Sequence, residues 1–480
     1  MFALLTTLSW LRVWTFHANI YDLGIFHQVL WNTARFHPFD SSLKHMSFLG
    51  DHFSPGLVLL APLEWLPHPI EVLLAAQAGA VVVTAWCVFR LAERQLPDPR
   101  VARVIGLATL MYPALVAPAL FDFHPEIFMA AALAAGLLAL HEDRFGRASL
   151  CFAAVLLGKE DSALVLAPLG LVIAAERRTR WLGVGLTVLS LAWIIAVVFV
   201  VMPHFRPPDS GRPWFYFQRY SHLGQTPGEV AEFVLSHPLE ALWRSFAFKK
   251  LITVAVLILG FGGAPLFGGR RVLAAVPFAA AHYLSSRTAQ FSFATQYLVE
   301  IAPLMAYAAI AGAPRTFGRW PRATASVALL VGVLVGVVPR FFEPDYLPHP
   351  EDAALRRAVA LVPVDAPVCA TNRFGASLSG RRSFDFCVCF VSEIEQYRYY
   401  HWPVTSSATY QLFDLDDEDT TPDAARRITV LRAAGAEVLL AESPVFVLRA
   451  TTEVLDRAAL ASADDPRVSD VRLSAHSKHR

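Results

Sequence analysis

The sequence predicts an α-helical integral membrane protein that ends in a small mixed α/β domain, and three observations support this fold class. Of the 480 residues, 55% are hydrophobic and 17% are charged, whereas a soluble domain has about 25% charged residues. The mean hydropathy is +0.44, and apolar runs follow one another as far as residue 338. Beyond residue 340 hydrophobicity drops, and strand-like pieces alternate with helical ones. The formal net charge of +1 gives no electrostatic indication of a nucleic-acid partner.

The apolar runs predict about eleven transmembrane helices. The first, from Phe2 to Trp14, is short for a span, which needs about 20 apolar residues. Either this helix is tilted and incomplete, or the chain begins inside a longer first helix, which is the interpretation that we favour. Because no cleavage site follows this run, we expect it to be a membrane anchor and not a cleaved signal peptide. The segment GLVLLAPLEWLPHP is too short and proline-broken to span, so we expect it in the membrane interface. The other ten runs cover roughly residues 70–90, 101–120, 127–140, 148–157, 162–175, 181–202, 248–267, 272–284, 297–313 and 323–338.

The connections between these runs alternate in character and predict the orientation. Short arginine-rich connections include RLAERQLPDPRVAR, HEDRFGR, ERRTR, GGRR and PRTFGRWPR, which the positive-inside rule assigns to the cytoplasm. The opening loop, FDFHPE, GKED, SSRTAQFSFATQ and the tail then face outward. This predicts a transmembrane domain over residues 1–339, with outer loops 15–68 and 203–250, followed by an extracytoplasmic α/β domain over residues 340–480.

Residues 148–175 allow either one comfortable span or two short ones. A single span would place every later arginine-rich connection outside, which violates the positive-inside rule. We therefore expect two short helices that meet at the charged turn from Lys159 to Asp161. Such a turn at membrane depth is tolerated where it lines a polar cavity.

Ionisable residues gather at the outer ends of these runs. A cluster of charges at membrane depth is expensive, so its presence indicates function. Its candidate members are Asp22, Asp51, His52, Asp122, His124, Glu126, Lys159, Glu160 and Asp161.

Asp22 directly follows the first apolar run and precedes the helical pattern LGIFHQVLW. One interpretation makes it a helix N-cap, whose side chain accepts a backbone N–H. The other makes it a general base, which needs a carboxylate placed near a nucleophilic hydroxyl.

The remaining candidates also have structural alternatives. Asp51 and His52 either form an Asp-capped turn, ligate a divalent metal or hold a phosphate. Glu126 suits the first turn of a helix. Lys159 either neutralises a phosphate or pairs with Glu160 or Asp161.

The loop over residues 203–250, which contains Arg219, carries arginines and aromatic residues suited to a phosphate-and-sugar groove. An interfacial aromatic belt is the default alternative.

The three C-terminal cysteines leave two interpretations open. If the tail lies outside the cytoplasm, Cys369 could bridge Cys387 or Cys389; otherwise the three are small buried hydrophobic residues.

Four motifs in order, YDLGIFHQ, GDHFSP, FDFHPE and GKED, resemble the bacterial and archaeal membrane proteins grouped as domain of unknown function 2079 (DUF2079). The resemblance runs from about Asn19 to Val338 and continues into the tail. That family is in turn similar to the glycosyltransferase C (GT-C) superfamily, multi-spanning enzymes that take a sugar from a polyprenyl-phosphate carrier. These enzymes carry an acidic residue in the first outer loop and an outer soluble C-terminal domain. The resemblance therefore makes Asp22 the candidate base, and Asp51 or Glu126 a second acid or metal ligand. Many such enzymes have paired acids at this place, whereas Asp22 stands beside Tyr21.

The sequence patterns predict an outward-facing cavity lined by charged residues. The resemblance implies that the protein is an inner-membrane glycosyltransferase, which transfers a sugar, with inversion, from a polyprenyl-phosphate donor to a sugar, lipid or protein acceptor outside the cytoplasm. Asp22 would be catalytic, and Lys159 and Arg219 would bind the leaving phosphate. The other outer residues, namely Asp51, His52, His124, Glu126, Glu160 and Asp161, would bind substrate. Asp51, His52 and Glu126 are also candidate ligands for a divalent metal ion as cofactor. The alternatives are a transporter or flippase of a lipid-linked or small polar substrate, and a non-catalytic scaffold.

Overall fold

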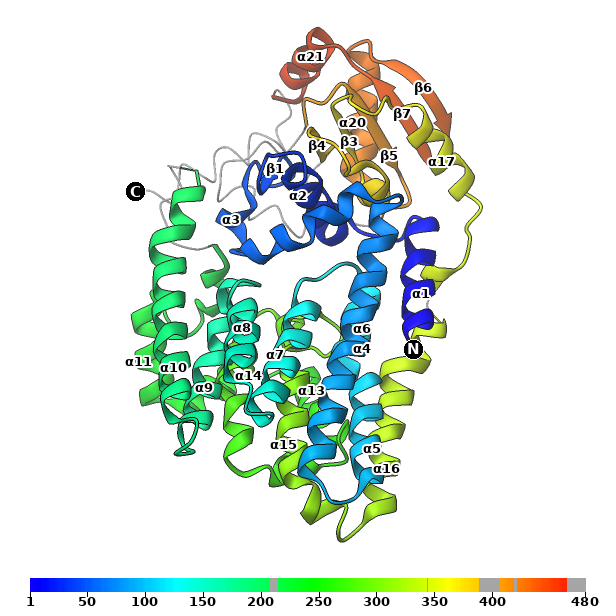
Figure 1. Cartoon of the computed structure of the whole chain (residues 1–480). Helices are drawn as coiled ribbons and strands as arrows, with labels where there is room; N and C mark the ends of the chain where they lie inside the picture. Colours follow the sequence, from blue (N-terminus) through cyan, green and yellow to red (C-terminus); the bar gives the residue numbers. More distant parts are fainter. Residues whose placement is uncertain (208–214, 343, 388–405, 418–420, 464–480) are drawn as a thin grey trace. The chain divides into compact units, whose positions relative to one another are not determined.

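The computed structural model describes residues 1–207, 215–342, 344–387, 406–417 and 421–463, and its chain forms two compact units (Figure 1). The first unit comprises Met1–Trp10 and Phe48–Pro344. The second comprises Leu11–Ser47 and Asp345–Arg480. The sequence did not suggest that the residues from 11 to 47 group with the tail.

The first unit is helical throughout its described part. Neighbouring helices pack as α4 with α5 and α7, α7 with α8, and α9 with α10 (Figure 1). The helices are α1 (Phe2–Trp14, shared with the second unit), α3 (Phe48–Asp51), α4 (Pro69–Gln95), α5 (Pro99–Leu110), α6 (Pro113–Phe121), α7 (Glu126–His141), α8 (Phe145–Leu156), α9 (Ala163–Ala174), α10 (Arg180–Ala196), α11 (Pro227–Ser236), α12 (Pro238–Arg244), α13 (Phe248–Leu259), α14 (Val276–Tyr283), α15 (Ile301–Thr316) and α16 (Pro321–Val331).

Each predicted apolar run contains helix, and the prediction for residues 148–175 is confirmed. Helices α8 and α9 are separate, and the short turn η4 (Glu160–Ser162) lies between them. Among the described residues, five segments are long and apolar enough to cross a membrane: Pro69–Gln95, Pro99–Phe121, Arg180–Phe205, Gln296–Thr316 and Pro321–Phe342. The protein is therefore a membrane protein with several apolar helices.

Helices α9 and α10 approach each other backbone to backbone. A Cβ at Gly170 would lie 2.7 Å from the carbonyl oxygen of Gly183, and a Cβ at Gly183 would lie 2.3 Å from the nitrogen of Ala174. Only glycine fits at such distances, and small residues are typical of close helix pairs in membranes. This contact fixes the helix that follows the charged turn at Lys159.

The second unit contains a five-stranded mixed sheet in the order β4-β3-β5-β7-β6. Strand β3 is parallel to β4 and β5, whereas β7 is antiparallel to β5 and β6. The mixed α/β composition predicted for the tail is thus present. The elements are η1 (Ile20–Gly24), α2 (Ile25–Thr33), β1 (Asp40–Ser41), β2 (Met46–Ser47), α17 (Asp352–Ala360), β3 (Val368–Ala370), η15 (Asn372–Phe374), α18 (Gly375–Leu378), β4 (Phe384–Phe386), β5 (Tyr410–Asp414), α20 (Thr421–Ala433), β6 (Glu437–Glu442), β7 (Val445–Arg449) and α21 (Thr452–Ala463).

The core of this unit includes a disulfide bond. Cys369 in β3 is bonded to Cys387, which follows β4, and both are fully buried. Phe413, Leu431 and Leu448 belong to the same apolar cluster, which brings α20 against the sheet. Cys389, the other possible partner of Cys369, lies outside the described residues.

Candidate functional site

Residues from three of the four sequence motifs meet in the first unit. The Nδ1 atom of His52, in GDHFSP, lies 2.9 Å from Oε1 of Glu160, in GKED. The other oxygen of Glu160 accepts a hydrogen bond of 3.0 Å from the backbone N–H of Phe53. Glu160 is only 1% exposed, so both of its oxygens are used inside the protein. Two motifs more than 100 residues apart therefore form one polar contact.

Asp51 is connected to the outer loop that the sequence singled out for its aromatic residues. The Tyr216 hydroxyl donates a 2.9 Å hydrogen bond to Oδ1 of Asp51, and the Tyr216 ring stacks on His52 with 5.1 Å between centroids. Arg206, from the start of the same loop, donates to the backbone oxygen of Gly50 at 2.8 Å. These contacts hold part of the loop against GDHFSP. A role of Asp51 as the cap of its own turn does not explain its hydrogen bond with Tyr216.

The third motif, FDFHPE, contributes the partner of Lys159. The Lys159 ammonium donates to Oε1 of Glu126 at 2.6 Å, and both side chains are buried. The structural alternative for Lys159 was a pair with Glu160 or Asp161, but its hydrogen-bonded partner is Glu126, 33 residues away. The ammonium also lies 5.3 Å from the centroid of the Tyr297 ring. A buried ion pair of this kind is expensive to desolvate, so it is weak evidence for stability and better evidence for a specific role.

A glutamine in α4 holds the FDFHPE turn in place. The side-chain amide of Gln77 donates to the backbone oxygens of Ala119 and Asp122 at 3.0 and 2.7 Å. Its side-chain oxygen accepts the backbone N–H of His124 at 2.7 Å. The His124 ring itself is buried and stacks on Phe121. Gln77 therefore positions Glu126 indirectly, by satisfying three backbone groups of the turn before it.

Two further buried groups near Lys159 were missed by the sequence predictions. Glu300 is 1% exposed and interacts electrostatically with Asp161, Glu126 and Lys159. His282, near the end of α14, interacts electrostatically with Lys159 and lies 5.9 Å from the Tyr297 ring. Each is an ionisable residue inside or at the end of an apolar run, which is by itself a signal of function. That signal was available in the sequence.

Several buried acidic oxygens of this cluster have no hydrogen-bond partner within the described ranges. They are Oε2 of Glu126, Oδ1 of Asp161 and Oε2 of Glu300. Unpaired buried polar groups are rare in folded proteins and call for an explanation, such as a bound substrate. We call this set the outer cluster: Asp51, His52, Glu126, Lys159, Glu160, Asp161, Glu300, His282, Tyr216, Tyr297 and Arg219.

Arg219 is the cation of the outer cluster that remains available to an anion. Its guanidinium lies 4.4 Å from the Tyr216 ring centroid and 5.9 Å from that of Tyr297. Among the residues described, no carboxylate pairs with it. The two tyrosine rings thus orient the guanidinium. Its N–H groups donate no hydrogen bond to a carboxylate of the described residues and can bind an anion.

Asp22 belongs to the second unit, where residues of the tail fix its position. It lies inside the helical turn η1, which is preceded by Asn19, so its interpretation as the N-cap is wrong. The Asn372 side chain binds the start of η1. Its oxygen accepts the backbone N–H of Ile20 at 2.9 Å, and its amide nitrogen donates to Oδ1 of Asn19 at 2.6 Å. A Cβ at Gly375 would lie 2.6 Å from the nitrogen of Ile20. The turn that carries Asp22 therefore packs directly on the tail backbone.

The rest of the YDLGIFHQ motif is also anchored on the tail. His27 Nδ1 lies 2.7 Å from the Ser379 hydroxyl, and the Gln28 amide donates to the Arg381 carbonyl at 3.2 Å. Tyr21 stacks on Phe386 with 4.9 Å between ring centroids. The side chains of His27 and Gln28 therefore attach this segment to the tail. Asp22 is the acidic residue of the attached segment.

A carboxyl with an unusual pKa lies in the same part of the second unit. Burial raises the pKa of Asp385, in β4, to about 7. Burial also lowers the pKa of His45, whose Nε2 lies 3.5 Å from Oδ1 of Asp385. A carboxyl that titrates near neutral pH is suited to proton transfer.

The three candidate metal ligands are each engaged by the protein. Asp51 accepts from Tyr216, His52 contacts Glu160 and Glu126 binds Lys159. In the described ranges, no three histidine, cysteine or acidic side chains converge in a way that could hold a metal ion.

Fold and site together define this protein as a polytopic membrane protein with a buried ionisable cluster, to which three of its four sequence motifs contribute. The chain belongs to the family described as "Predicted membrane protein (DUF2079)", whose family model matches residues 12–400. The resemblance stated from the four motifs is thereby confirmed.

Solved structures that are similar to this chain include two of ArnT from Cupriavidus metallidurans. The form bound to undecaprenyl phosphate is 14% identical, with a TM-score of 0.49 and coverage of 93% of this chain and 97% of ArnT. The apo form is also 14% identical, with a TM-score of 0.36 and coverage of 94% and 98%. No curated protein sequence matches this chain.

Proposed function

We propose that this protein is an inverting membrane glycosyltransferase that moves a sugar from a polyprenyl-phosphate donor to an acceptor on the extracytoplasmic side. The observation that carries the proposal is the outer cluster. In it Arg219, which has no acidic partner among the described residues, lies over the rings of Tyr216 and Tyr297, and the buried Lys159 lies near the Tyr297 ring as well. Arginine forks bind phosphate, and aromatic faces stack on sugars. The resemblance to the GT-C superfamily supplies the reaction type.

In this proposal the outer cluster binds the donor. Arg219 and Lys159 hold the phosphate, which carries the negative charge of the leaving group. Tyr216 and Tyr297 face the sugar. The unpaired oxygens of Glu126 and Asp161 accept hydrogen bonds from its hydroxyls, while Asp51, His52, His124 and Glu160 keep these groups in position.

Asp22 is the proposed base. Its carboxylate takes the proton of the acceptor hydroxyl, whose oxygen attacks the anomeric carbon of the sugar. The bond between that carbon and the phosphate oxygen breaks, and the polyprenyl phosphate leaves with the electron pair. Attack opposite the leaving group inverts the anomeric configuration. No metal ion is required by this sequence of steps.

The topology needed for this function remains part of the proposal. It has about eleven spans over residues 1–339, arginine-rich loops in the cytoplasm, and the domain over residues 340–480 outside a bacterial inner membrane. The disulfide Cys369–Cys387 supports an oxidising compartment for this domain, because such bonds are rare in the cytosol.

Turnover of radiolabelled polyprenyl-phosphate sugars by the purified protein in lipid tests the proposal. We expect Asp22→Asn to lower the rate by about 100- to 10,000-fold, the range for loss of a general base. Asp40→Asn is the matched control, because Asp40 is an exposed aspartate of the same segment. Arg219→Gln should instead raise the KM for the donor. Normal turnover in Asp22→Asn would refute its role.

The alternative function is a transporter or flippase of a lipid-linked or small polar substrate. Buried carboxylates such as Glu126 and Glu300 are also found in proton relays of transporters. Substrate-dependent flux across proteoliposomes, without release of carrier phosphate from any donor, would establish this alternative and exclude the enzyme.

A further inference from the structure

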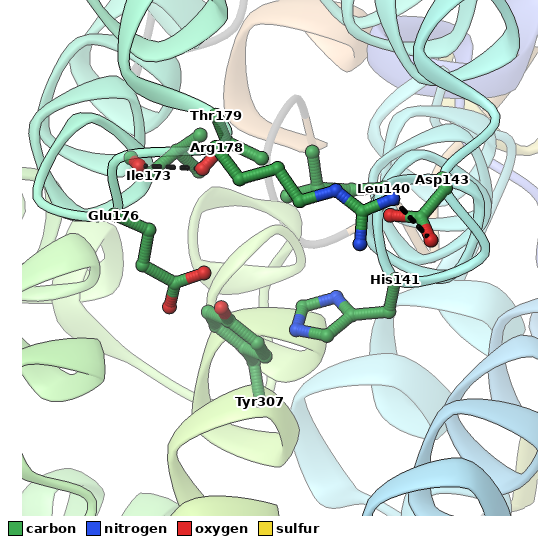
Figure 2. A pocket seen from close by; sticks show the side chains of 8 residues that line it. All are labelled: Leu140, His141, Asp143, Ile173, Glu176, Arg178, Thr179 and Tyr307. Atoms are coloured by element: carbon green, nitrogen blue, oxygen red, sulfur yellow. Dashed lines mark hydrogen bonds and ion pairs between the residues drawn. The ribbon is translucent and has the colours of Figure 1, made fainter.

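A polar cavity lies in the first unit, and none of its lining residues belongs to the outer cluster. Its volume is about 170 Å³. It lies where α7 and α9 end and where α15 passes them, beside the arginine-rich loops HEDRFGR and ERRTR (Figure 2). The lining residues are Leu140, His141, Asp143, Ile173, Glu176, Arg178, Thr179 and Tyr307.

Two uncharged hydrogen-bonding groups of the cavity are available to a ligand. Figure 2 shows His141 and Tyr307 side by side at its wall, with 5.5 Å between ring centroids. Nδ1 of His141 contacts the backbone oxygen of Leu137 at 3.0 Å. Nε2 of His141 and the Tyr307 hydroxyl have no partner in the part of the chain that is described. Because the Leu137 carbonyl accepts from Nδ1 of His141, Nε2 of the uncharged ring is an acceptor. The Tyr307 hydroxyl can donate to an anion.

Arginines surround these two groups. Arg178 pairs with Asp143, and Arg270 with Glu176, each at 2.6 Å. The guanidinium of Arg271 lies 4.1 Å from the Tyr307 ring centroid, and no carboxylate pairs with it among the described residues. The three segments around the cavity, residues 141–147, 174–180 and 269–271, carry seven arginines and three acidic residues. The local charge is positive, which favours an anionic ligand.

The size and position of the cavity narrow the choice of anion. Pockets for whole small-molecule ligands have about 300–1,000 Å³, so this one suits a single headgroup. Leu171 and Trp181, which flank the lining residues Ile173 and Thr179 in sequence, are 63% and 82% exposed. Exposed apolar residues here indicate contact with lipid, and tryptophan is typical of the headgroup level.

We propose that this cavity binds the phosphate of an anionic phospholipid headgroup at the arginine-rich face of the membrane. Tyr307 donates a hydrogen bond to a phosphate oxygen, while Arg178 and Arg271 supply positive charge. Basic pockets between transmembrane helices are known sites for such headgroups. A soluble phosphate ester has the same phosphate group, and the experiment below distinguishes it from the lipid.

The test is a binding titration of the full-length protein in neutral detergent, followed by the rise in melting temperature. Phosphatidylglycerol is the probe, phosphatidylcholine is the uncharged comparison, and glycerol 3-phosphate is the soluble ester. Tyr307→Phe and Arg178→Gln each remove one donor or charge from the cavity. Arg319→Gln is the matched control, because Arg319 is exposed in another arginine-rich loop.

We expect saturable binding of phosphatidylglycerol that weakens about tenfold or more in Tyr307→Phe and Arg178→Gln, as for loss of a hydrogen bond to a charged group. Arg319→Gln should bind normally. An equal loss in Arg319→Gln would show general surface attraction and overturn the site. Unchanged affinity in both cavity variants would also overturn it. Tight binding of glycerol 3-phosphate with none of the lipid would replace the lipid by a soluble ester.

Discussion

Replacing Lys159 with methionine should destabilise the first unit strongly, because it leaves Glu126 buried without its cation. The two side chains are 6% and 4% exposed, and their charged atoms lie 2.6 Å apart. Removing one partner of such a pair costs about 3–5 kcal/mol. A change of 1 kcal/mol shifts the melting temperature by about 2–4 °C in a domain of 150–250 residues. For this larger unit we take the lower figure and expect a decrease of about 6–10 °C.

The assay is thermal unfolding of the purified protein in detergent, with Lys249→Met as the control. Lys249 is an exposed lysine of α13, so its replacement should change the melting temperature little. The double variant Glu126→Gln/Lys159→Met removes both charges and should recover most of the lost stability, because no unpaired ion remains from the pair. If Lys159→Met melts like Lys249→Met, or if the double variant is less stable than the single one, the buried pair does not have the energetics inferred here.

Two predictions concern the second unit. Arg373 binds Asp414 and Glu351 at 3.0 and 3.1 Å, so Arg373→Met should cost about 3–5 kcal/mol of unfolding free energy in urea, because the buried carboxylate of Asp414 loses its cation. Asp385 has a pKa of about 7 when folded and an ordinary value of 3.8. The folded state therefore binds the proton more tightly, and stability should fall as pH rises from about 4 to 7, by as much as about 4 kcal/mol. Melting temperatures across this range should be flatter in Asp385→Asn.

Exposed residues of the same unit provide the controls. Arg432→Met, on α20, and Asp456→Asn, on α21, change similar side chains that face solvent. A loss of stability in Arg432→Met equal to that in Arg373→Met would argue against a specific network. A pH profile of Asp385→Asn that matches the wild type would show that another group causes the pH dependence.

Hydropathy and charge predicted the elements well because a bilayer limits what they can be. An apolar run at membrane depth has to satisfy its own backbone hydrogen bonds, so it becomes a helix. The positive-inside rule, applied to the arginine-rich loops, predicted that α8 and α9 are two helices that meet near Lys159. The strand-like pieces of the tail predicted strands, and β3, β4, β6 and β7 lie in or overlap these pieces, whereas β5 was not predicted.

Partners within the site were harder to predict because they come from packing between distant segments. Lys159 was expected to pair with its neighbours in sequence or with substrate, but in the fold it reaches Glu126 on another helix. Glu300 and His282 stand in apolar runs that gave no sign of facing the other acids. Asp22 could be a helix cap by its local sequence, and only the contact of Asn372 with Asn19 and Ile20 shows that the turn starts earlier.

The sequence by itself determined that this protein is helical and membrane-embedded, that a small α/β domain follows, and that four polar motifs carry most of the candidate site residues. These properties depend on composition and on order along the chain. The tertiary structure decided that GDHFSP, FDFHPE and GKED meet in one cluster, whereas YDLGIFHQ is anchored on the tail. That division depends on side-chain contacts between residues that are often more than 100 positions apart, and such contacts form only when the helices and the sheet pack.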